Sequence, residues 1–239
     1  MKPERPLGRS FFKRSRCMET YDVVYFETLD STNDYIKNHI DSMHDHTLVL
    51  AGNQTLGRGR RDKSWSSAPG MNFLGSFYKV KKPVEPYQAM IEGVLAAVLT
   101  LECFGVKPFI KPPNDVYFKD RKVAGILAEI IHRKKCHVIV GIGINVNEHK
   151  ESPAIALSDV TLASHDLSHV TECVKRNMEK VESMSASSKL ELFRDKIPFG
   201  RIYARNKEVH GLLESIEDSF TCKVVGIRVP CESLTFEYR

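Results

Sequence analysis

Apolar and polar positions alternate along the chain in a way that predicts strands and helices in mixed order. Period-two or continuous apolar runs predict strands over residues 21–27, 47–51, 71–80, 109–110, 116–118, 123–131 and 137–146. Helical spacing predicts helices over residues 35–40, 87–104 and about 167–197, the first of them preceded by capping residues at Asp30 to Asp34. This order of elements predicts an α+β fold.

The last forty residues have a different pattern. Residues 201–204, 209–213, 221–225 and 234–238 are typical of short strands, and turn signals separate them. An all-β unit of this size buries too little surface to be very stable unless it docks on a larger body. We therefore expect a basic arm over residues 1–20, a main domain over 21–198 and a small C-terminal β domain over 199–239.

Composition excludes several classes of protein. The 239 residues are 42% hydrophobic and 27% charged, as in an ordinary globular protein. The longest mostly apolar stretch, residues 93–106, is shorter than the roughly 20 residues that a membrane helix needs, so we expect no membrane partner. The six Cys form no C-x-x-C pair, which suggests neither a zinc site nor a disulfide framework. Free thiols in a reducing compartment, the cytoplasm, are expected.

The charge is concentrated at one end of the chain. Of the net charge of +5, residues 1–20 contribute +4, because six Lys and Arg there face two Glu. A solvated tail, or an upstream start codon, explains this arm better than an organelle presequence does, although its Arg content would suit one. The remainder is nearly neutral, so we expect no specific DNA binding.

A glycine and arginine segment, from Gln54 to Trp65, is the densest candidate for chemistry. Four cations and one acid within residues 58–63 repel one another, so the empty loop should be mobile and an anion should order it. Arg58 and Arg60 would point the same way in an extended chain, while Gly57 and Gly59 admit a ligand to the backbone, which suits a phosphate. A solvated basic loop or a nucleic-acid patch explains the composition equally well.

A second constellation runs from Lys111 through two prolines to Asn114 and Asp115. The prolines hold Lys111 extended, and a hairpin turn at residues 119–121 returns Lys122 close to it. Two ammonium groups and a carboxylate can neutralise phosphate charge and hold Mg²⁺. Taken alone, the motif is better explained as a proline turn with surface lysines. The Gly-Ile-Gly run at residues 141–143 would let a ligand or a neighbouring strand come close.

Six motifs in this order resemble the biotin protein ligases. They are Asp30-Ser-Thr-Asn33, Gln54-x-x-Gly-Arg-Gly-Arg-Arg61, Trp65, Lys111-x-Pro-Asn-Asp115, Lys122-x-x-Gly-Ile-Leu127 and Gly141-x-Gly-Ile-Asn145. The resemblance covers residues 21–150 strongly and the C-terminal β unit weakly. It implies a class II synthetase-like mixed sheet with flanking helices, followed by a small SH3-like β barrel.

The resemblance also implies an activity. Biotin and MgATP would give biotinoyl-AMP and pyrophosphate, and the biotinoyl group would then pass to a lysine of the biotin carboxyl carrier domain of a carboxylase such as acetyl-CoA carboxylase. ATP and biotin are thus expected as substrates, with Mg²⁺. A biotin carboxylate that attacks ATP must approach another anion, so positive charge has to be in place beforehand.

The resemblance assigns roles to residues of this chain. Arg58, Arg60, Lys111 and Lys122 supply the catalytic positive charge. The biotin head group is held by Ser31, Thr32, Asn33 and Gln54, while Arg58, Gly59, Arg60 and Lys122 contact its carboxylate and the acyl phosphate. The nucleotide is expected to contact Arg58, Arg60, Trp65, Asn114, Lys122 and Asn145, and Asp115 is a candidate for the metal or a lysine partner.

The chain departs from the family pattern in two places: the family usually has Trp at Pro112 and Gly-Arg at Asp62-Lys63. Asp62 would pair with an arginine, lower the loop's effective charge and weaken retention of the adenylate. The residues before the first strand are too few for a DNA-binding helix-turn-helix domain, so a ligase-only role is expected, and a homodimer is left open.

Two other functions are weighed against this one. A lipoate or octanoate ligase or transferase has a similar fold and acyl chemistry, but it would lack the double arginine loop in this register. A non-catalytic nucleic-acid-binding protein would use the basic arm and loop. The near-neutral remainder and the absence of aromatic residues among the basic ones argue against it.

Overall fold

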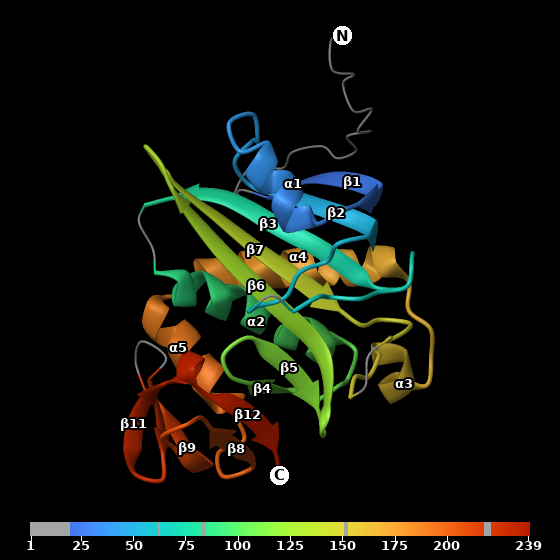
Figure 1. The fold of residues 1–239 in the computed structure, drawn as a ribbon. Coiled ribbons are helices and arrows are strands. Elements are labelled where there is room, and N and C mark those ends of the chain that lie inside the picture. Colours follow the sequence, from blue (N-terminus) through green and yellow to red (C-terminus); the bar gives the residue numbers. More distant parts are fainter. Residues whose placement is uncertain (1–19, 62, 83–84, 151–152, 218–220) are drawn as a thin grey trace.

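The computed structural model describes residues 20–61, 63–82, 85–150, 153–217 and 221–239, and the basic arm expected over residues 1–20 therefore lies almost wholly outside them. A seven-stranded mixed sheet forms the centre of the molecule (Figure 1), in the order β1-β2-β3-β7-β6-β5-β4. Its strands are β1 (Asp22–Leu29), β2 (Thr47–Gln54), β3 (Phe73–Lys81), β4 (Phe109–Lys111), β5 (Asp115–Phe118), β6 (Arg121–His132) and β7 (Cys136–Ile144). Only β1 and β2 pair in parallel; the other neighbours are antiparallel.

Helices cover both faces of this sheet. They are α1 (Thr32–Asn38), α2 (Pro86–Cys103), α3 (Leu157–Thr161), α4 (Leu167–Ser183) and α5 (Ala186–Asp195). Ser31 caps α1, since its hydroxyl accepts a hydrogen bond from the Asp34 amide. The predicted α+β class is confirmed, and none of the helices in the described ranges is long and apolar enough to cross a membrane.

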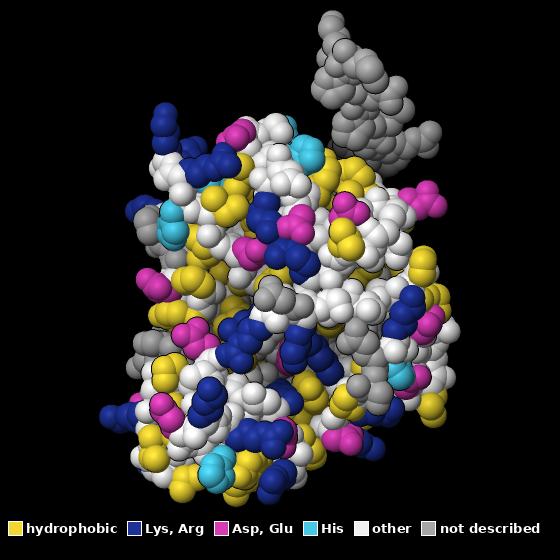
Figure 2. Space-filling model, viewed as in Figure 1, with side chains coloured by type: hydrophobic (Ala, Val, Ile, Leu, Met, Phe, Trp, Pro, Cys, Tyr) yellow, Lys and Arg dark blue, Asp and Glu magenta, His cyan; other side chains and the backbone are white. Residues whose placement is uncertain are grey.

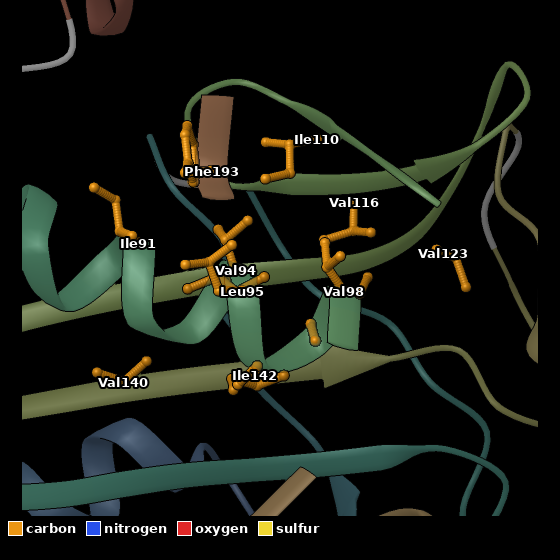
Figure 3. Close-up of a cluster of buried hydrophobic side chains, with 14 of the residues drawn as sticks. Ile91, Val94, Leu95, Val98, Ile110, Val116, Val123, Val140, Ile142 and Phe193 are labelled. Atoms are coloured by element: carbon orange, nitrogen blue, oxygen red, sulfur yellow. The ribbon is translucent and has the colours of Figure 1, made fainter. Parts of the chain in front are cut away.

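Strand parity separates two cores. Val138, Val140 and Ile142 of β7 belong to the larger core, where α2 packs its own apolar side chains against the sheet (Figure 3). Ile139 points to the opposite face and packs with Ile36 of α1 in a smaller core. Gly141 and Gly143 share the parity of Ile139, so they lie on the α1 side of the sheet.

A charged cluster lies inside the α2 face. Lys79 of β3 is fully buried, and its ammonium lies 2.7 Å from the Glu92 carboxylate of α2 and also pairs with Glu182 of α4. Glu92 also pairs with Lys189 of α5 at 2.7 Å. Buried charges persist only when they are paired in this way. The cluster therefore fixes three helices to one strand.

The C-terminal residues form a second, antiparallel sheet with the open order β11-β10-β9-β8-β12. Its strands are β8 (Ile202–Arg205), β9 (His210–Ile216), β10 (Thr221–Val224), β11 (Ile227–Pro230) and β12 (Thr235–Tyr238), and the 3₁₀ helix η2 (Cys231–Ser233) joins the last two. It docks on the main body, since Arg194 Nε donates to the Ile216 carbonyl at 3.0 Å and Tyr238 stacks on Phe109.

Several sequence expectations need correction here. The expectation that all six cysteines are free thiols is wrong, because Cys222 and Cys231 form a disulfide with a Cα–Cα distance of 5.2 Å. Both are buried side by side because β10 and β11 are hairpin partners. The inference of a reducing compartment loses part of its support. The single helix expected over residues 167–197 is two helices, with a break at Met184 and Ser185, and β11 and α3 were not predicted.

Candidate active site

Residues from β3, β7 and β6 form the floor of a cleft on the α1 face of the sheet. The register aligns Ser76 with Gly141, and Gly141 in turn with Leu127. Two residues further along β7, on the same face of the sheet, Gly143 pairs with Gly125 of β6. A side chain at these glycines would collide with others in the cleft: a Cβ on Gly141 would lie 2.4 Å from Asn33 Oδ1. The Gly-x-Gly motif thus allows a close approach, but the groups that come close are the side chains of Asn33 and Trp65 rather than the neighbouring strand that the sequence suggested as one alternative to a ligand.

The buried N-terminus of α1 supplies hydrogen-bonding groups at one end of the cleft. The Thr32 amide donates to Gln54 Oε1 at 2.8 Å, and the Thr32 and Ser76 hydroxyls lie 2.6 Å apart. Ser76 donates to Asn33 Oδ1 at 2.5 Å. Ser31, Thr32 and Asn33 are all less than 5% exposed, so these polar side chains are held in place by one another.

The glycine and arginine segment folds into a small hairpin above this floor. Its backbone bonds run from Gly59 N to Lys63 O at 2.6 Å and from Trp65 N to Gly57 O at 2.8 Å. Arg58 Nε donates to Asp34 at 2.8 Å, and its NH2 group donates to both oxygens of Glu129. Burial lowers the pKa of Arg58, but the hydrogen bonds that it donates to Glu129 and Asp34, with the negative charge of these carboxylates, outweigh that effect, so the pKa is raised.

Arg60 reaches further into the cleft. Its guanidinium donates to Asn114 Oδ1 at 3.3 Å, and Asn114 in turn donates to the Ile126 carbonyl at 2.9 Å. Burial and the neighbouring Arg61 lower the pKa of Arg60, which nevertheless stays a cation. The two cationic motifs, distant in sequence, therefore meet through this bond.

Lys111, Asp115 and Lys122 come together across the β5–β6 hairpin, as the sequence predicted. Lys122 Nζ lies 2.7 Å from Asp115 Oδ1. Lys111 Nζ lies 4.8 Å above the Tyr117 ring. Burial lowers the pKa of Lys111, and Lys122 adds to the effect while Asp115 opposes it. A desolvated cation beside a second one favours an anionic ligand.

Trp65 crosses the cleft over the glycine pair. The Lys122 ammonium lies 5.5 Å from its ring centroid, and a Cβ on Gly143 would lie 2.5 Å from Trp65 Cε2. The indole Nε1 is buried with no hydrogen-bond partner within the described residues. An unpartnered buried donor indicates a place for a ligand acceptor.

These groups share one cleft of about 480 Å³. All of the predicted site residues line it: Ser31, Thr32, Asn33, Gln54, Arg58, Gly59, Arg60, Trp65, Lys111, Asn114, Asp115, Lys122 and Asn145. Residues 232 and 234–236 of the C-terminal sheet contribute to its wall. Figure 2 shows Lys and Arg side chains gathered at the middle of one face of the molecule.

Sequence reasoning missed three polar residues around this cleft: Asp34, Ser76 and Glu129. Ser76 is fully buried in an apolar strand, and Glu129 is an isolated acid in β6. A signal was present only for Glu129, because it shares the period-two face of Gly125 and Leu127. The suggested partner of the arginines, Asp62, lies outside the described residues.

The residues suit a metal ion that arrives with a nucleotide better than a resident one. In the described ranges, no three His, Cys, Asp or Glu side chains gather as a metal site. Asp115 offers one carboxylate, which is already paired with Lys122. Mg²⁺ is commonly held by one or two carboxylates together with substrate phosphates.

Three comparisons place this chain among known proteins. It is 32% identical over 129 residues to the bifunctional ligase/repressor BirA of Escherichia coli, covering 52% of this chain and 40% of that protein. It is 30% identical over 145 residues to the biotin-(acetyl-CoA-carboxylase) ligase of Mycobacterium tuberculosis, covering 56% and 53%. The chain thus matches about half or less of the length of these curated relatives.

A solved structure extends the likeness in fold. The biotin protein ligase from Aquifex aeolicus in complex with biotin and ATP superposes with a TM-score of 0.75 at 24% identity, over 91% of this chain and 99% of that one. At this identity the match shows a shared fold. A sequence model of the Biotin/lipoate A/B protein ligase family matches residues 25–145, about half of the chain. The chain therefore belongs to the biotin/lipoate A/B protein ligase family.

Proposed function

We propose that this protein is an ATP-dependent biotin protein ligase. It forms biotinoyl-AMP from biotin and MgATP, releases pyrophosphate, and transfers the biotinoyl group to a lysine of a carboxylase's biotin carboxyl carrier domain. The names of the relatives support this activity. The observation that carries it is the convergence of Arg58, Arg60, Lys111 and Lys122 on one cleft, because a carboxylate must meet a phosphate there.

The roles of the residues follow from this geometry. Lys122, next to the glycine pair, would contact the biotin carboxylate and the α-phosphate of ATP. Arg60, with Arg58 and Gly59, would cover the acyl phosphate and exclude water from the mixed anhydride. Trp65, Asn114 and Asn145 would contact the nucleotide. Mg²⁺ would enter with ATP, and Asp115 is the carboxylate best placed to approach it.

The polar end of the cleft favours biotin over lipoate or octanoate, which the family also includes. Ser31, Thr32, Asn33 and Gln54 there can donate to and accept from the ureido ring of biotin. An octanoyl or lipoyl tail has no ureido donors and acceptors, so it would gain no hydrogen bonds from these groups, and any of them that it separated from a present partner would be buried unpaired at a cost in free energy. A nucleic-acid binder would need exposed aromatic residues between its cations.

The C-terminal sheet, the domain boundary and Pro112 have roles in the proposed enzyme as well. The C-terminal sheet would serve as the SH3-like unit of the family, and its residues 232 and 234–236 would help to close the nucleotide end of the cleft. We predict a domain boundary between residues 198 and 199 and a ligase-only role without specific DNA binding. A homodimer and a cytoplasmic location also stay predictions. Pro112 lines the cleft where the family usually has Trp, so one aromatic contact would be missing.

The test is a pyrophosphate exchange assay with one acid at a time. The purified protein is incubated with MgATP, labelled pyrophosphate and either biotin, octanoate or lipoate. The proposal predicts exchange that depends on biotin alone. Exchange with octanoate or lipoate instead would establish the rival ligase, while salt-sensitive retention on nucleic acid without any exchange would establish a binding protein.

A further inference from the structure

Glu129 links the two ends of the cleft. It lies on the cleft face of β6, and its carboxylate accepts hydrogen bonds from three side chains, two on α1 and one in the basic loop. Asn33 Nδ2 of α1 donates to Oε2 at 2.8 Å, and Lys37 Nζ donates to Oε1 at 3.1 Å. Arg58 NH2, from the basic loop, donates to both oxygens at 3.1 and 2.9 Å.

The bond to Asn33 decides which way its amide faces. One donor group, Nδ2, serves both Glu129 and the Leu127 carbonyl, while Oδ1 accepts from Ser76. Both acceptors draw the amide nitrogen to their side, because neither an ionised carboxylate nor a carbonyl can donate, and the bond to Glu129 is the shorter of the two, at 2.8 Å against 3.2 Å. Oδ1 is thereby turned toward Ser76 and Gly141, with a lone pair left for a ligand N–H.

The bond to Arg58 sets the position of the basic loop. Asp34 accepts a hydrogen bond from Nε of Arg58, and Glu129 accepts from NH2, so neither bond uses NH1. A guanidinium held by two carboxylates keeps NH1 for an anionic ligand. Although burial raises the pKa of Glu129, bonds from Asn33, Lys37 and Arg58 lower it overall, so Glu129 is ionised at neutral pH.

We propose that Glu129 is a positioning residue that orients Asn33 toward the ureido ring of biotin and holds the Arg58 loop in register with it. The inference rests on the proposed function for the identity of the ligand. Glu129 itself touches no reacting atom. It would act by making head-group binding and loop placement depend on one carboxylate.

Glu129→Gln tests this with almost no change in volume. A Gln has a single acceptor oxygen. If that oxygen takes the place of Oε2 it can still accept from Asn33 and Arg58, but its NH₂ group then faces the Lys37 and Arg58 donors at the place of Oε1; in the opposite orientation the NH₂ group faces Asn33 and Arg58. In both orientations the ion pair with Arg58 is lost. We expect the KM for biotin in pyrophosphate exchange to rise about tenfold, while the KM for ATP stays within about twofold. Trypsin should also cut the ligand-free protein faster after the loop arginines.

Two variants serve as controls. Asp41→Asn removes a more exposed carboxylate, paired with Arg133, and should change neither KM nor loop cleavage. Glu129→Asp keeps the charge but is one methylene shorter, so an intermediate KM for biotin is expected. This second variant also carries the test if Glu129→Gln fails to fold, which its melting temperature would report.

The outcomes separate the two proposals. An equal rise in both KM values, or an unchanged KM for biotin in a folded Glu129→Gln protein, would overturn the positioning role. If the unmodified protein shows no exchange at all, the proposed function fails. The comparison of tryptic cleavage still decides the loop coupling in that case, because equal cleavage rates would contradict it and faster cleavage of Glu129→Gln would support it.

Discussion

Lys122 and Asp115 form an ion pair with a 2.7 Å separation across the β5–β6 hairpin, inside the cleft that also receives Arg60. The side chains are 30% and 26% exposed, so the pair is partly solvated and its net stability is small. Lys122 can therefore change partner when a stronger anion arrives. The Lys122 ammonium is therefore available in the cleft to bind a substrate carboxylate. In the empty protein its charge is compensated by Asp115.

Replacing Lys122 should abolish adenylation while preserving the fold. We predict that Lys122→Met lowers the rate of biotin-dependent pyrophosphate exchange by about 10²-fold or more, because a cation at the developing charge is lost. The melting temperature should stay within a few degrees, since a partly exposed pair contributes little. Arg121→Gln, an exposed change next to it in β6, should keep normal exchange. A Lys122→Met protein with full activity would contradict the assigned role.

Arg60→Gly should separate formation of the intermediate from its retention. The fold should be intact, because Arg60 contributes one 3.3 Å bond to Asn114. Biotinoyl-AMP should escape before the acceptor arrives, so lysines of bystander proteins should be labelled more strongly, as seen on a streptavidin blot. Arg201→Gly, in a turn outside the cleft, is the control. Equal labelling by the variant and the unmodified protein would count against loop closure by Arg60.

Trp65 offers a direct optical report on the cleft, because it is the single Trp of the chain. Gly143→Ala places a methyl group about where the indole lies, since the Cβ would be 2.5 Å from Trp65 Cε2. We predict a red-shifted Trp emission and a higher KM for ATP. Gly226→Ala, at a turn with φ 78°, should lower stability by about 1 kcal/mol and leave the emission unchanged. An unshifted spectrum for Gly143→Ala would refute this packing.

The buried cluster of Lys79 and Glu92 should control acid stability. Burial raises the pKa of Glu92, but Lys79 and Lys81 lower it overall to about 2, against 4.5 in the unfolded chain. Its stabilisation is thus fully present above about pH 4.5 and is lost as the pH falls toward 2. Glu92→Gln should flatten this part of the stability curve, and Glu92→Ala should lower the free energy of unfolding by about 3 kcal/mol. Urea titrations from pH 2 to 7 measure both.

Strand pattern alone predicted most of the main sheet, because its apolar runs are long and buried. The expected strand over residues 137–146 is β7, and the expected helix over 87–104 is α2, each with ends shifted by one or two residues. β11 escaped prediction because three of its four residues are exposed, Ile227, Arg228 and Pro230, and the proline ends it. The disulfide escaped because Cys222 and Cys231 meet only through the pairing of β10 with β11.

The site residues that belong to sequence motifs could be predicted, whereas those brought to the cleft only by tertiary contacts could not. Gly59, Gly141, Gly143, Arg60 and Lys122 stand in dense motifs, and all of them line the cleft. Ser76 and Glu129 stand in no motif. The period-two face that Glu129 shares with Gly125 and Leu127 gives only its side of the strand, and its partners follow only from the register with Gly141 and the position of α1. The pairing of Arg58 with Asp34 and Glu129 likewise depends on how the loop folds back over α1.

Mass spectrometry of the small molecules bound to the protein decides whether the cleft joins biotin to AMP. The full chain is incubated with biotin and MgATP, separated from free ligand and denatured, and the Lys122→Met protein is treated in parallel. We predict that biotinoyl-AMP is released from the unmodified protein in near-stoichiometric amount and, after the same short incubation, in far smaller amount from the variant. Recovery of biotin and ATP unchanged from the unmodified protein, with no adenylate, would contradict the proposed chemistry.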